Sequence, residues 1–462
     1  MLISLNHCPT MCRSQLDHLP SGPVGTASPA TSGVQDKLPD SVFEFCRAPH
    51  SFLLNLARTQ GPNASFRLNS DTFAVLGDPH AIHAVFNGSM EDFEKAEFGD
   101  VIEAVFGNGV FTADGQEWKE FHDLVAPLFS RSRMAALEPV VHSVMDCQIE
   151  QWTRLGESAE PVELIKSAKR LAFDVVAGGL IGIQDQSAAD RLFAVLDRAD
   201  RTEVVRLSYF GKRIPAIQSH FRPSPFAEQI DRIVMTIARQ KIEGTSRTQE
   251  PEGDLIGDAI ASPLFRSVAD ERKPQVVRDL ICSFLSAGYI TTGDSLFWTL
   301  YLLARHPAAQ DRAQREIEAA ASSSWLSAVI NESLRLFPPA WFLGRIARRP
   351  VELGGMNFAA GTRLVCSPYV LHRMPALWPA PDEFRPERFL PGQRVAPRSY
   401  IPFGSGMRAC TGRAMALMEL SILVPAILSR FKLRLTDDTP VTLAGTFSMQ
   451  PREPVRIRMI PR

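Results

Sequence analysis

The feature that most constrains the fold is a helical apolar pattern that extends from Gln275 to Arg305. Apolar residues recur in this segment at the spacing of one helix face. A helix of about thirty residues is long enough to cross a domain from side to side. Its most apolar part, residues 281–304, contains Asp294, so we interpret the segment as a buried core helix and not as a membrane span.

The rest of the chain is mostly helical in pattern. Residues 116–250 are almost wholly helical apart from a proline-rich loop at 213–226, and residues 246–274 are polar and broken. Further helices are expected from Asp78 onward, over 325–336 and over about 412–430. Short β-like segments lie at 65–68, 73–76, 351–355, 362–366 and within 431–460. The pattern predicts a mainly α fold with small β sheets in a single large domain.

The first 39 residues differ from the remainder. They are rich in Ser, Pro and Gly without a sustained period, which is typical of a flexible leader. The apolar stretch at residues 1–5 is far shorter than the core of a signal peptide or a membrane span. We therefore expect a flexible leader over 1–39, one folded domain over 40–462 and no membrane anchor.

The charge balance excludes one class of function. The chain has 50 Lys and Arg against 51 Asp and Glu, so it lacks the basic surplus of a protein that mainly binds nucleic acid or anionic lipid. Its 7 cysteines include no C-x-x-C pair, which argues against a disulfide framework and a thiolate zinc site. A reducing compartment fits this usage, and we expect a soluble, cytoplasmic monomer.

The densest unusual string is residues 403–412, just before the last expected helix. Its glycines permit the backbone to approach a flat group closely. Cys410 stands at the start of that helix, where the helix dipole and unpaired backbone N–H groups favour the thiolate over the thiol. A thiolate in such a loop is a soft metal ligand. The alternative is that Cys410 is a small buried hydrophobic residue, as most free cysteines are.

The whole string, F-G-x-G-x-R-x-C-x-G, resembles the haem-binding loop of the cytochrome P450 family, and Ala416 and Glu419 match the A-x-x-E that follows it. Three further segments resemble family motifs in order and spacing: 332–335 (E-x-x-R), 384–389 (F-x-P-E-R-F) and 287–292 in the long helix. The resemblance covers about residues 40–460. It implies a P450-like haem-thiolate domain over 40–462, of the soluble bacterial type.

By this resemblance Cys410 would be the axial thiolate ligand of haem b, the cofactor that we expect. Phe403 would pack near the thiolate, and Arg408 would meet a haem propionate. His122 follows Trp118 by four residues, where the family usually has Arg. Its imidazole can still donate to a propionate but binds it less firmly. The other residues to which we assign haem binding are Trp118, Ala287, Gly288, Arg345, Gly404 and Gly412.

The long helix would supply the oxygen chemistry. Ala287 and Gly288 would leave room for dioxygen and substrate, and the Thr291 hydroxyl would relay protons from water. The alternative is that Thr291 only donates to its own i−4 carbonyl. Ile290 departs from the family, which usually has an acid there. Asp294, one turn further on, is a candidate substitute, and its alternative is a solvated helix charge. The catalytic residues that we expect are Thr291, Thr292 and Asp294.

Two further groups follow from the resemblance. Glu332, Arg335 and Arg388 would form a buried charge cluster that holds the haem loop, whereas without the other motifs they would be surface salt bridges of little energy. The substrate pocket would be lined by Ile290, Trp341, Phe342 and Phe447. These residues are apolar and favour a lipophilic substrate, although such residues are as often simple core.

The resemblance implies a monooxygenase that inserts one oxygen atom from O2 into a lipophilic molecule, such as a terpenoid, a fatty acyl chain or an aromatic metabolite of secondary metabolism. The chain has no Gly-rich dinucleotide fingerprint, and only about fifty residues follow the cysteine loop, too few for a flavin reductase domain. We therefore expect electrons from a ferredoxin or flavodoxin with a separate NAD(P)H reductase.

Two alternatives remain open. A haem-thiolate isomerase or lyase, or a peroxide-using enzyme, needs no external protons and would tolerate Ile290. A non-catalytic haem sensor is the third hypothesis, and Gly288 and Thr291 in the long helix argue against it.

Overall fold

The computed structural model describes eight stretches of the chain: 42–68, 71–95, 107–157, 160–201, 225–248, 253–320, 323–445 and 448–462. The chain divides into two units, Met1–Leu38 and Pro39–Arg462, and every described residue belongs to the second. The expected leader over 1–39 lies outside the described residues, so it stays a prediction.

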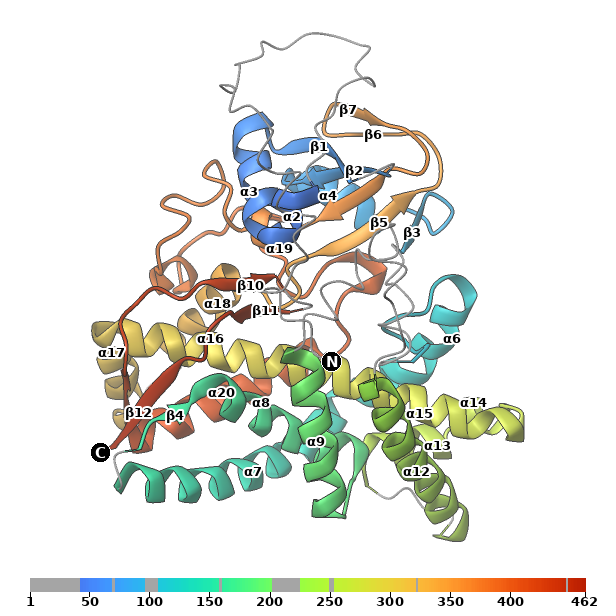
Figure 1. The fold of residues 1–462 in the computed structure, drawn as a ribbon, viewed down its shortest axis with the longest axis vertical. Helices are drawn as coiled ribbons and strands as arrows, with labels where there is room; N and C mark the ends of the chain where they lie inside the picture. The colour runs from blue at the N-terminus through green and yellow to red at the C-terminus, as the bar shows by residue number, and fades with distance from the viewer. Residues whose placement is uncertain are drawn as a thin grey trace, which may run out of the picture. The chain divides into compact units, whose positions relative to one another are not determined.

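The long helix expected over 275–305 is present. It consists of α15 (Lys273–Phe284), a π-helical turn η5 (Leu285–Ile290) and α16 (Thr291–Arg305), which follow one another without a break (Figure 1). A π turn inside an α-helix is rare and is frequent at functional sites. Nearly every residue of α16 is buried, because helices pack on several of its sides.

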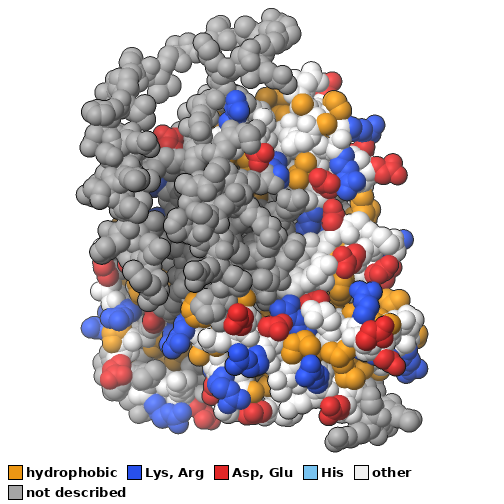
Figure 2. All heavy atoms as spheres, turned by 45° about the vertical axis from the view of Figure 1, so that its right-hand side comes forward, with side chains coloured by type: hydrophobic (Ala, Val, Ile, Leu, Met, Phe, Trp, Pro, Cys, Tyr) orange, Lys and Arg blue, Asp and Glu red, His pale blue; other side chains and the backbone are white. Residues whose placement is uncertain are grey.

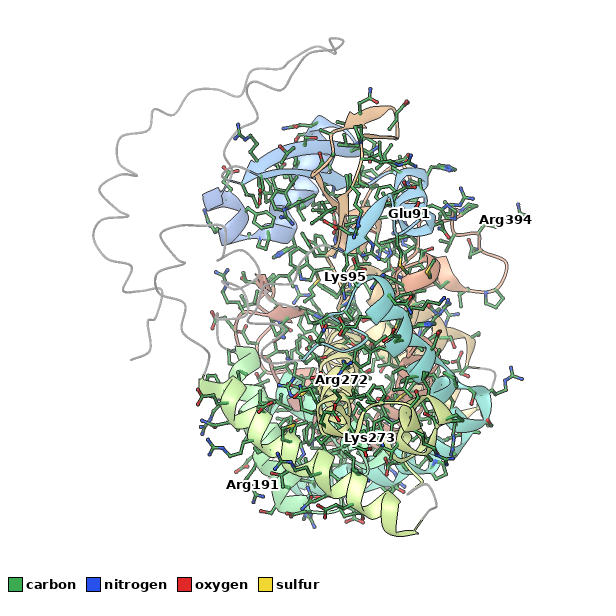
Figure 3. The ribbon with its side chains drawn as sticks, turned by 90° about the vertical axis from the view of Figure 1, so that its right-hand side faces the viewer. Glu91, Lys95, Arg191, Arg272, Lys273 and Arg394 are labelled. Carbon is green, nitrogen blue, oxygen red and sulfur yellow. The ribbon has the colours of Figure 1, made fainter. Side chains whose placement is uncertain are left out.

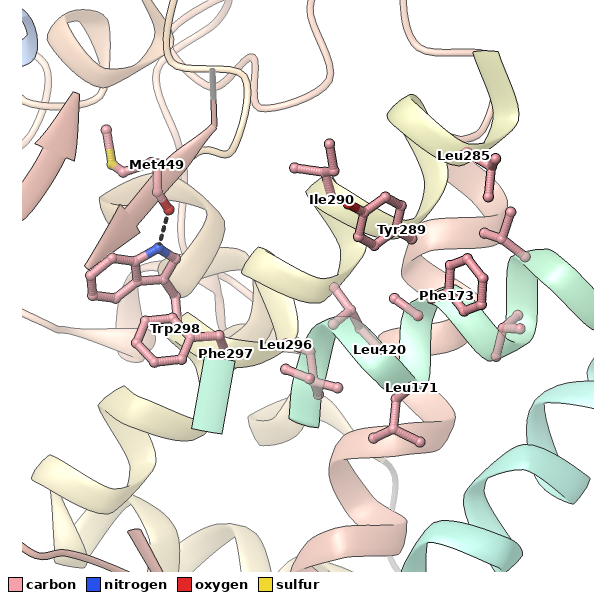
Figure 4. Packing of buried hydrophobic residues seen from close by; sticks show 14 of the residues in the cluster. Leu171, Phe173, Leu285, Tyr289, Ile290, Leu296, Phe297, Trp298, Leu420 and Met449 are labelled. Carbon is pink, nitrogen blue, oxygen red and sulfur yellow. Dashed lines mark hydrogen bonds between the residues drawn. The ribbon is translucent and has the colours of Figure 1, made fainter. Parts of the chain in front are cut away.

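Several helices pack around the long helix, and three of them make much of its contact. They are α8 (Leu164–Val175) and α20 (Arg413–Arg430), which contact α16, and α12 (Pro225–Thr248), which contacts α15. Figure 4 shows Leu171 and Phe173 of α8, Leu296 and Phe297 of α16 and Leu420 of α20 in one apolar cluster. This cluster is the main hydrophobic core of the molecule.

The remaining helices and helical turns complete a mainly α fold. They are α2 (Val42–Arg47), α3 (Pro49–Gln60), α4 (Pro79–Asn87), α6 (Gly115–Val125), η2 (Ala126–Phe129), α7 (Arg131–Glu157), η3 (Val176–Ile181), α9 (Gln186–Arg201), α13 (Leu255–Ala261), α14 (Pro263–Arg266), η4 (Asp270–Arg272), α17 (Pro307–Glu318), α18 (Ser324–Leu336), α19 (Pro368–Leu371), η6 (Pro386–Phe389) and η7 (Gly406–Arg408). The Asp78 side chain caps α4 by accepting from Ala81 N–H at 2.7 Å.

The largest sheet has five strands in the order β1-β2-β8-β5-β3: β1 (Asn63–Leu68), β2 (Asp71–Leu76), β8 (Arg363–Cys366), β5 (Leu343–Ala347) and β3 (Phe93–Lys95). The expected hairpin over 65–76 is present as β1 and β2, with Phe66 opposite Phe73. Only the β2–β8 pair is parallel. A second apolar cluster packs α4 against this sheet.

Three smaller sheets are present among the described residues. One has three strands in the order β4 (Val162–Glu163), β12 (Arg456–Pro461) and β9 (Phe431–Leu435). The other two are pairs: β10 (Leu443–Gly445) with β11 (Met449–Pro451), and β6 (Val351–Leu353) with β7 (Met356–Phe358). Trp298 of α16 donates through Nε1 to Met449 O at 2.6 Å, the dashed line in Figure 4. This bond ties the long helix to β11.

Helix α7 continues through Pro139, and Leu137, Val141 and Met145, four residues apart, stay buried on one face. The broken segment 246–274 contains α13 and α14, both capped by side chains that precede them. The predicted loop 213–226 lies outside the described residues up to 224, and its last two residues begin α12. Among the described helices, none is both long and apolar enough to span a bilayer.

Candidate functional site

The cysteine loop is a tight turn laid against α4. Gly404 and Gly406 have φ of 70° and 72°, a region that favours glycine. A Cβ on Gly406 would overlap the carbonyl oxygen of Phe86, so no other residue fits at this close approach. The backbone N–H of Cys410 donates to Phe403 O at 2.9 Å, which closes the loop just before α20 begins at Arg413.

Cys410 lies three residues before the start of α20. Its residue surface is exposed, yet the surrounding protein atoms raise the pKa of its thiol by desolvation. The Gly412 N–H and the charge of Arg413 act in the opposite direction, because both favour the thiolate. A bound cation removes the thiol proton outright. The alternative that Cys410 is a buried hydrophobic residue is wrong for this structure.

Arg408 packs against α6, close to two of the expected haem-binding residues. Its guanidinium carbon is 4.3 Å from the ring centre of Trp118, and the rings of Trp118 and His122 are 4.9 Å apart. Arg408 also forms an ion pair with Asp114, the residue just before α6. The structure therefore brings Trp118, His122 and Arg408 together.

The neighbourhood of Arg408 has a surplus of positive charge. Burial lowers the pKa of Arg408, Asp114 opposes this effect, and the positive charge of Arg345 adds to it. Asp114 is itself held by the backbone N–H of Lys95, labelled in Figure 3, at 3.0 Å. Although burial alone would raise the pKa of Asp114, this N–H and Arg408 hold it below the usual value. Arg408 is therefore held between the carboxylate of Asp114 and the positive charge of Arg345.

The long helix has one open face in an otherwise buried segment. Ala287 is exposed, and Gly288 and Thr291 are half-buried, whereas their neighbours in η5 and α16 are buried. The Thr291 hydroxyl donates to Ala287 O at 2.5 Å, which is the i−4 bond weighed from the sequence. A Cβ on Gly288 would lie 2.7 Å from Val176 Cγ2, so this glycine serves the close contact of η5 with η3.

Three other predicted residues of this helix are buried. Ile290 belongs to the main core, and Thr292 has almost no exposed surface. Asp294 is 0% exposed and pairs with Lys169 of α8, with Nζ and Oδ1 3.4 Å apart. The interpretation of Asp294 as a solvated helix charge is therefore wrong, because helix α8 covers it. Lys169 was missed, since nothing in the sequence relates it to a residue 125 positions away.

Glu332, Arg335 and Arg388 lie together below the surface. Arg335 donates to both Glu332 oxygens, at 2.7 and 2.8 Å, and both side chains are fully buried. Arg388 donates to Glu332 Oε1 at 3.3 Å. The interpretation as surface salt bridges is wrong. Arg335 also satisfies the carbonyls of Pro381 and Glu383, at 2.7 and 3.0 Å, so the cluster fixes an irregular segment of backbone.

His372 extends this cluster to Ile401, just before the cysteine loop, and it was missed from the sequence. Its Nε2 accepts from the backbone N–H of Ile401 at 2.9 Å, and its Nδ1 lies 3.2 Å from Arg335 O. Burial and the charge of Arg335 hold the pKa of His372 well below the ordinary 6.5, so the ring is neutral. The signal in the sequence was weak: a histidine that ends an apolar run, residues 368–371.

The expected pocket residues are only partly brought together. Trp341 is buried and its ring is 5.6 Å from that of Phe342, which is half-buried. The ring of Trp341 is also 6.2 Å from that of His50 of α3. Phe447 lies outside the described residues. Whether these residues line a substrate pocket stays a prediction.

Comparison with known proteins decides the family. The cytochrome P450 family model matches residues 41–458. The chain belongs to the cytochrome P450 family. Cytochrome P450 3A29 of Sus scrofa is 28% identical to this P450, and the match covers 77% of the present chain and 76% of the relative. Lithocholate 6-beta-hydroxylase of Mesocricetus auratus is 27% identical, over 84% and 82%, and cytochrome P450 3A2 of Rattus norvegicus is 25% identical, over 80% and 78%.

Membership establishes the general chemistry. This P450 is a haem-thiolate oxidoreductase of the monooxygenase class, and its cofactor is haem with an axial cysteine thiolate. The site fits that cofactor: Cys410 is exposed just before α20, and the charge of Arg408 lies nearby in the same loop. These relatives are mammalian proteins, so the expected bacterial type stays a prediction.

Proposed function

We propose that this P450 inserts one oxygen atom from O2 into a lipophilic small molecule, such as a terpenoid, a fatty acyl chain or an aromatic metabolite of secondary metabolism. The open face formed by Ala287, Gly288 and Thr291 carries the proposal, because a buried helix exposes small and hydroxyl residues there and nowhere else in η5 and α16. The name of one relative describes hydroxylation of lithocholate, a mostly apolar molecule, which supports a lipophilic substrate.

We propose a role for each residue of the site. Cys410 ligates the haem iron, Gly404 and Gly412 keep its surroundings open, and Phe403 packs beside it. Arg408 and Arg345, with Trp118 and His122, hold the propionates. Haem, when bound, supplies the activation of O2. Thr291 holds water and protons at the open face, and Trp341, Phe342, Ile290 and Phe447 shape the substrate site.

The first test is the ligand itself. Reduced protein with carbon monoxide should absorb at the long wavelength that is specific to thiolate ligation, and Cys410→Ser should lose that band. A matched control is Cys147→Ser, which changes an exposed cysteine of α7 and should retain the band. A normal band in Cys410→Ser would contradict the assignment.

A second candidate function rests on Ile290. A buried isoleucine occupies the position where an acid is usual, and it cannot pass protons. A haem-thiolate isomerase, lyase or peroxide-using enzyme would tolerate this residue. Turnover with NAD(P)H, ferredoxin and reductase, compared with turnover on peroxide alone, separates the two. Efficient product formation from peroxide only would favour the second candidate.

The electron donor in our proposal is a ferredoxin or flavodoxin with a separate NAD(P)H reductase. Met407 of the cysteine loop is 59% exposed and offers an apolar contact, and Arg413 is exposed beside it. Arg348 and Arg349 are less available, because they pair with Glu94 and Asp92. Figure 2 shows acidic and basic side chains interspersed on one face, without a patch of one sign.

We place this enzyme in the cytoplasm as a monomer.

A further inference from the structure

A buried ion pair joins the long helix to α8. Lys169 is 3% exposed and Asp294 is 0% exposed, and their charged atoms are 3.4 Å apart. The contact is close because Gly293 has no side chain: a Cβ there would lie 2.8 Å from both Cα and Cγ of Lys169. The backbone of α16 therefore rests directly on α8, and the next residue, Asp294, meets the lysine that α8 presents.

Stability alone does not explain such a pair. Two charges removed from water lose their hydration, and a buried ion pair can often be replaced by apolar residues of similar volume without loss of stability. Removing only one partner is different, because it leaves a lone buried charge. A paired charge can favour one register of the two helices over an apolar contact, because the attraction offsets the loss of hydration only where the two charged groups lie close together.

The pair stands next to the place where the long helix changes its geometry. The π turn η5 ends at Ile290 and α16 begins at Thr291, three residues before Asp294. Around this junction two side-chain hydroxyl groups add hydrogen bonds to backbone carbonyl groups. Thr291 donates to Ala287 O, and Ser295 donates to Thr291 O at 2.8 Å. A π turn holds one extra residue per turn, so the open face would rotate if the turn shifted along the helix.

We propose that the Lys169–Asp294 ion pair fixes the π-to-α junction and thereby holds Thr291 in the geometry that couples oxygen consumption to substrate oxidation. Lys169 and Asp294 are positioning residues in this proposal. Asp294 acts through the backbone and not as a proton donor, because α8 covers it completely. The part that concerns oxygen use rests on the proposed function.

The test begins with hydrogen exchange on the haem-loaded protein. Lys169→Met should accelerate exchange of the amides of residues 285–292 by about tenfold or more relative to wild type. Lys241→Met is the matched control, because it removes the lysine from another buried pair, Lys241–Asp254, whose atoms are 2.7 Å apart and which joins α12 to α13. It should leave exchange over 285–292 unchanged. Equal acceleration in both variants would contradict the proposal.

A double variant separates position from stability. Lys169→Met with Asp294→Leu removes both charges, so it should fold with a Tm at or above that of the wild type. Exchange over 285–292 should nevertheless stay fast, because the apolar contact does not favour one register of the two helices. Restored slow exchange in this variant would show that the pair serves stability only. The double variant also decides the question if Lys169→Met does not fold.

Coupling supplies the second readout. Product formed per NAD(P)H consumed should fall by about tenfold in the double variant and stay unchanged in Lys241→Met, since small displacements of reacting groups have large effects on rate. Accelerated exchange with unchanged coupling would overturn the link to Thr291. Absence of any oxygen-dependent product from the wild type would instead contradict the proposed function, and the exchange result would still report on the junction.

Discussion

Glu419 is a single buried carboxyl group for which no ion pair is found within the described part of the chain. It is 1% exposed on α20, and its Oε2 has no hydrogen-bond partner among the described residues. Burial raises the pKa of Glu419 from the ordinary 4.5 to about 8. The folded protein therefore carries this group protonated near neutral pH, whereas the unfolded chain carries it ionised.

The sign of the resulting pH dependence is fixed. Between pH 4.5 and about 8 the folded state binds one proton more than the unfolded state, so stability falls as pH rises, by about 1.4 kcal/mol per pH unit. Glu419→Gln removes this difference. We expect the variant and the wild type to be about equally stable at pH 4.5 and the variant to be more stable by a few kcal/mol at pH 8, measured by urea unfolding.

The control is Glu352→Gln on β6, where the side chain is exposed. Its stability should follow the wild type at every pH. A Glu419→Gln curve that ran parallel to the wild type would mean that Glu419 is solvated or paired in solution.

The close contact of α16 with α8 depends on Gly293. Alanine forms helices better than glycine by about 1 kcal/mol, yet Gly293→Ala would place a Cβ 2.8 Å from the backbone of Lys169. The helices must separate to accommodate it, so we expect a net loss of about 1–3 kcal/mol in the free energy of unfolding. Gly178→Ala in η3 is the control, because its Cβ would meet only Val140 Cγ1, at 3.8 Å. Equal stability of the two variants would contradict the close contact of α8 with α16.

Elements with a strong period could be predicted from the sequence. The helix over 275–305 is an example, because its apolar residues repeat over many turns, and the hairpin at 65–76 is another. The π turn at 285–290 was not predicted, since a single extra residue hardly changes the apolar period. β3 and β4 were not predicted either, because strands of three and two residues are set by their neighbours and not by propensity.

Some residues of the site could likewise be predicted from the sequence, and others could not. Cys410, Glu332 and Arg335 could be named from motifs, because their residue types and spacing are distinctive. Lys169 and His372 could not, since their roles depend on partners that only the folded chain brings near. The burial of Asp294 likewise depends on α8, which is far away in the sequence.

At the scale of the whole molecule, His372 joins α18 to the cysteine loop and responds to acid. Its Nε2 accepts from Ile401 N–H and its Nδ1–H donates to Arg335 O. A proton on Nε2 would remove the acceptor and place a charge beside Arg335. Burial, with this charge, holds the pKa of His372 well below 6.5. As pH falls below 6.5 the unfolded chain gains a proton that the folded protein refuses, so stability falls with acid, by about 1.4 kcal/mol per pH unit.

This slope has the opposite sign to that of Glu419. His372→Gln retains an acceptor for Ile401 but does not titrate. At pH 7.5 it should be less stable than the wild type by about 1–3 kcal/mol, because the bond to Arg335 O is lost. The difference in the free energy of unfolding should shrink by about 1.4 kcal/mol for each pH unit below 6.5. Loss of haem from the wild type should coincide with unfolding. Urea unfolding from pH 7.5 to 5 measures this, with His142→Gln, an exposed residue of α7, as the control. A constant difference across this range would show that His372 takes up a proton as readily in the folded protein as in the unfolded chain, which would contradict a neutral ring that links the charge cluster to the cysteine loop.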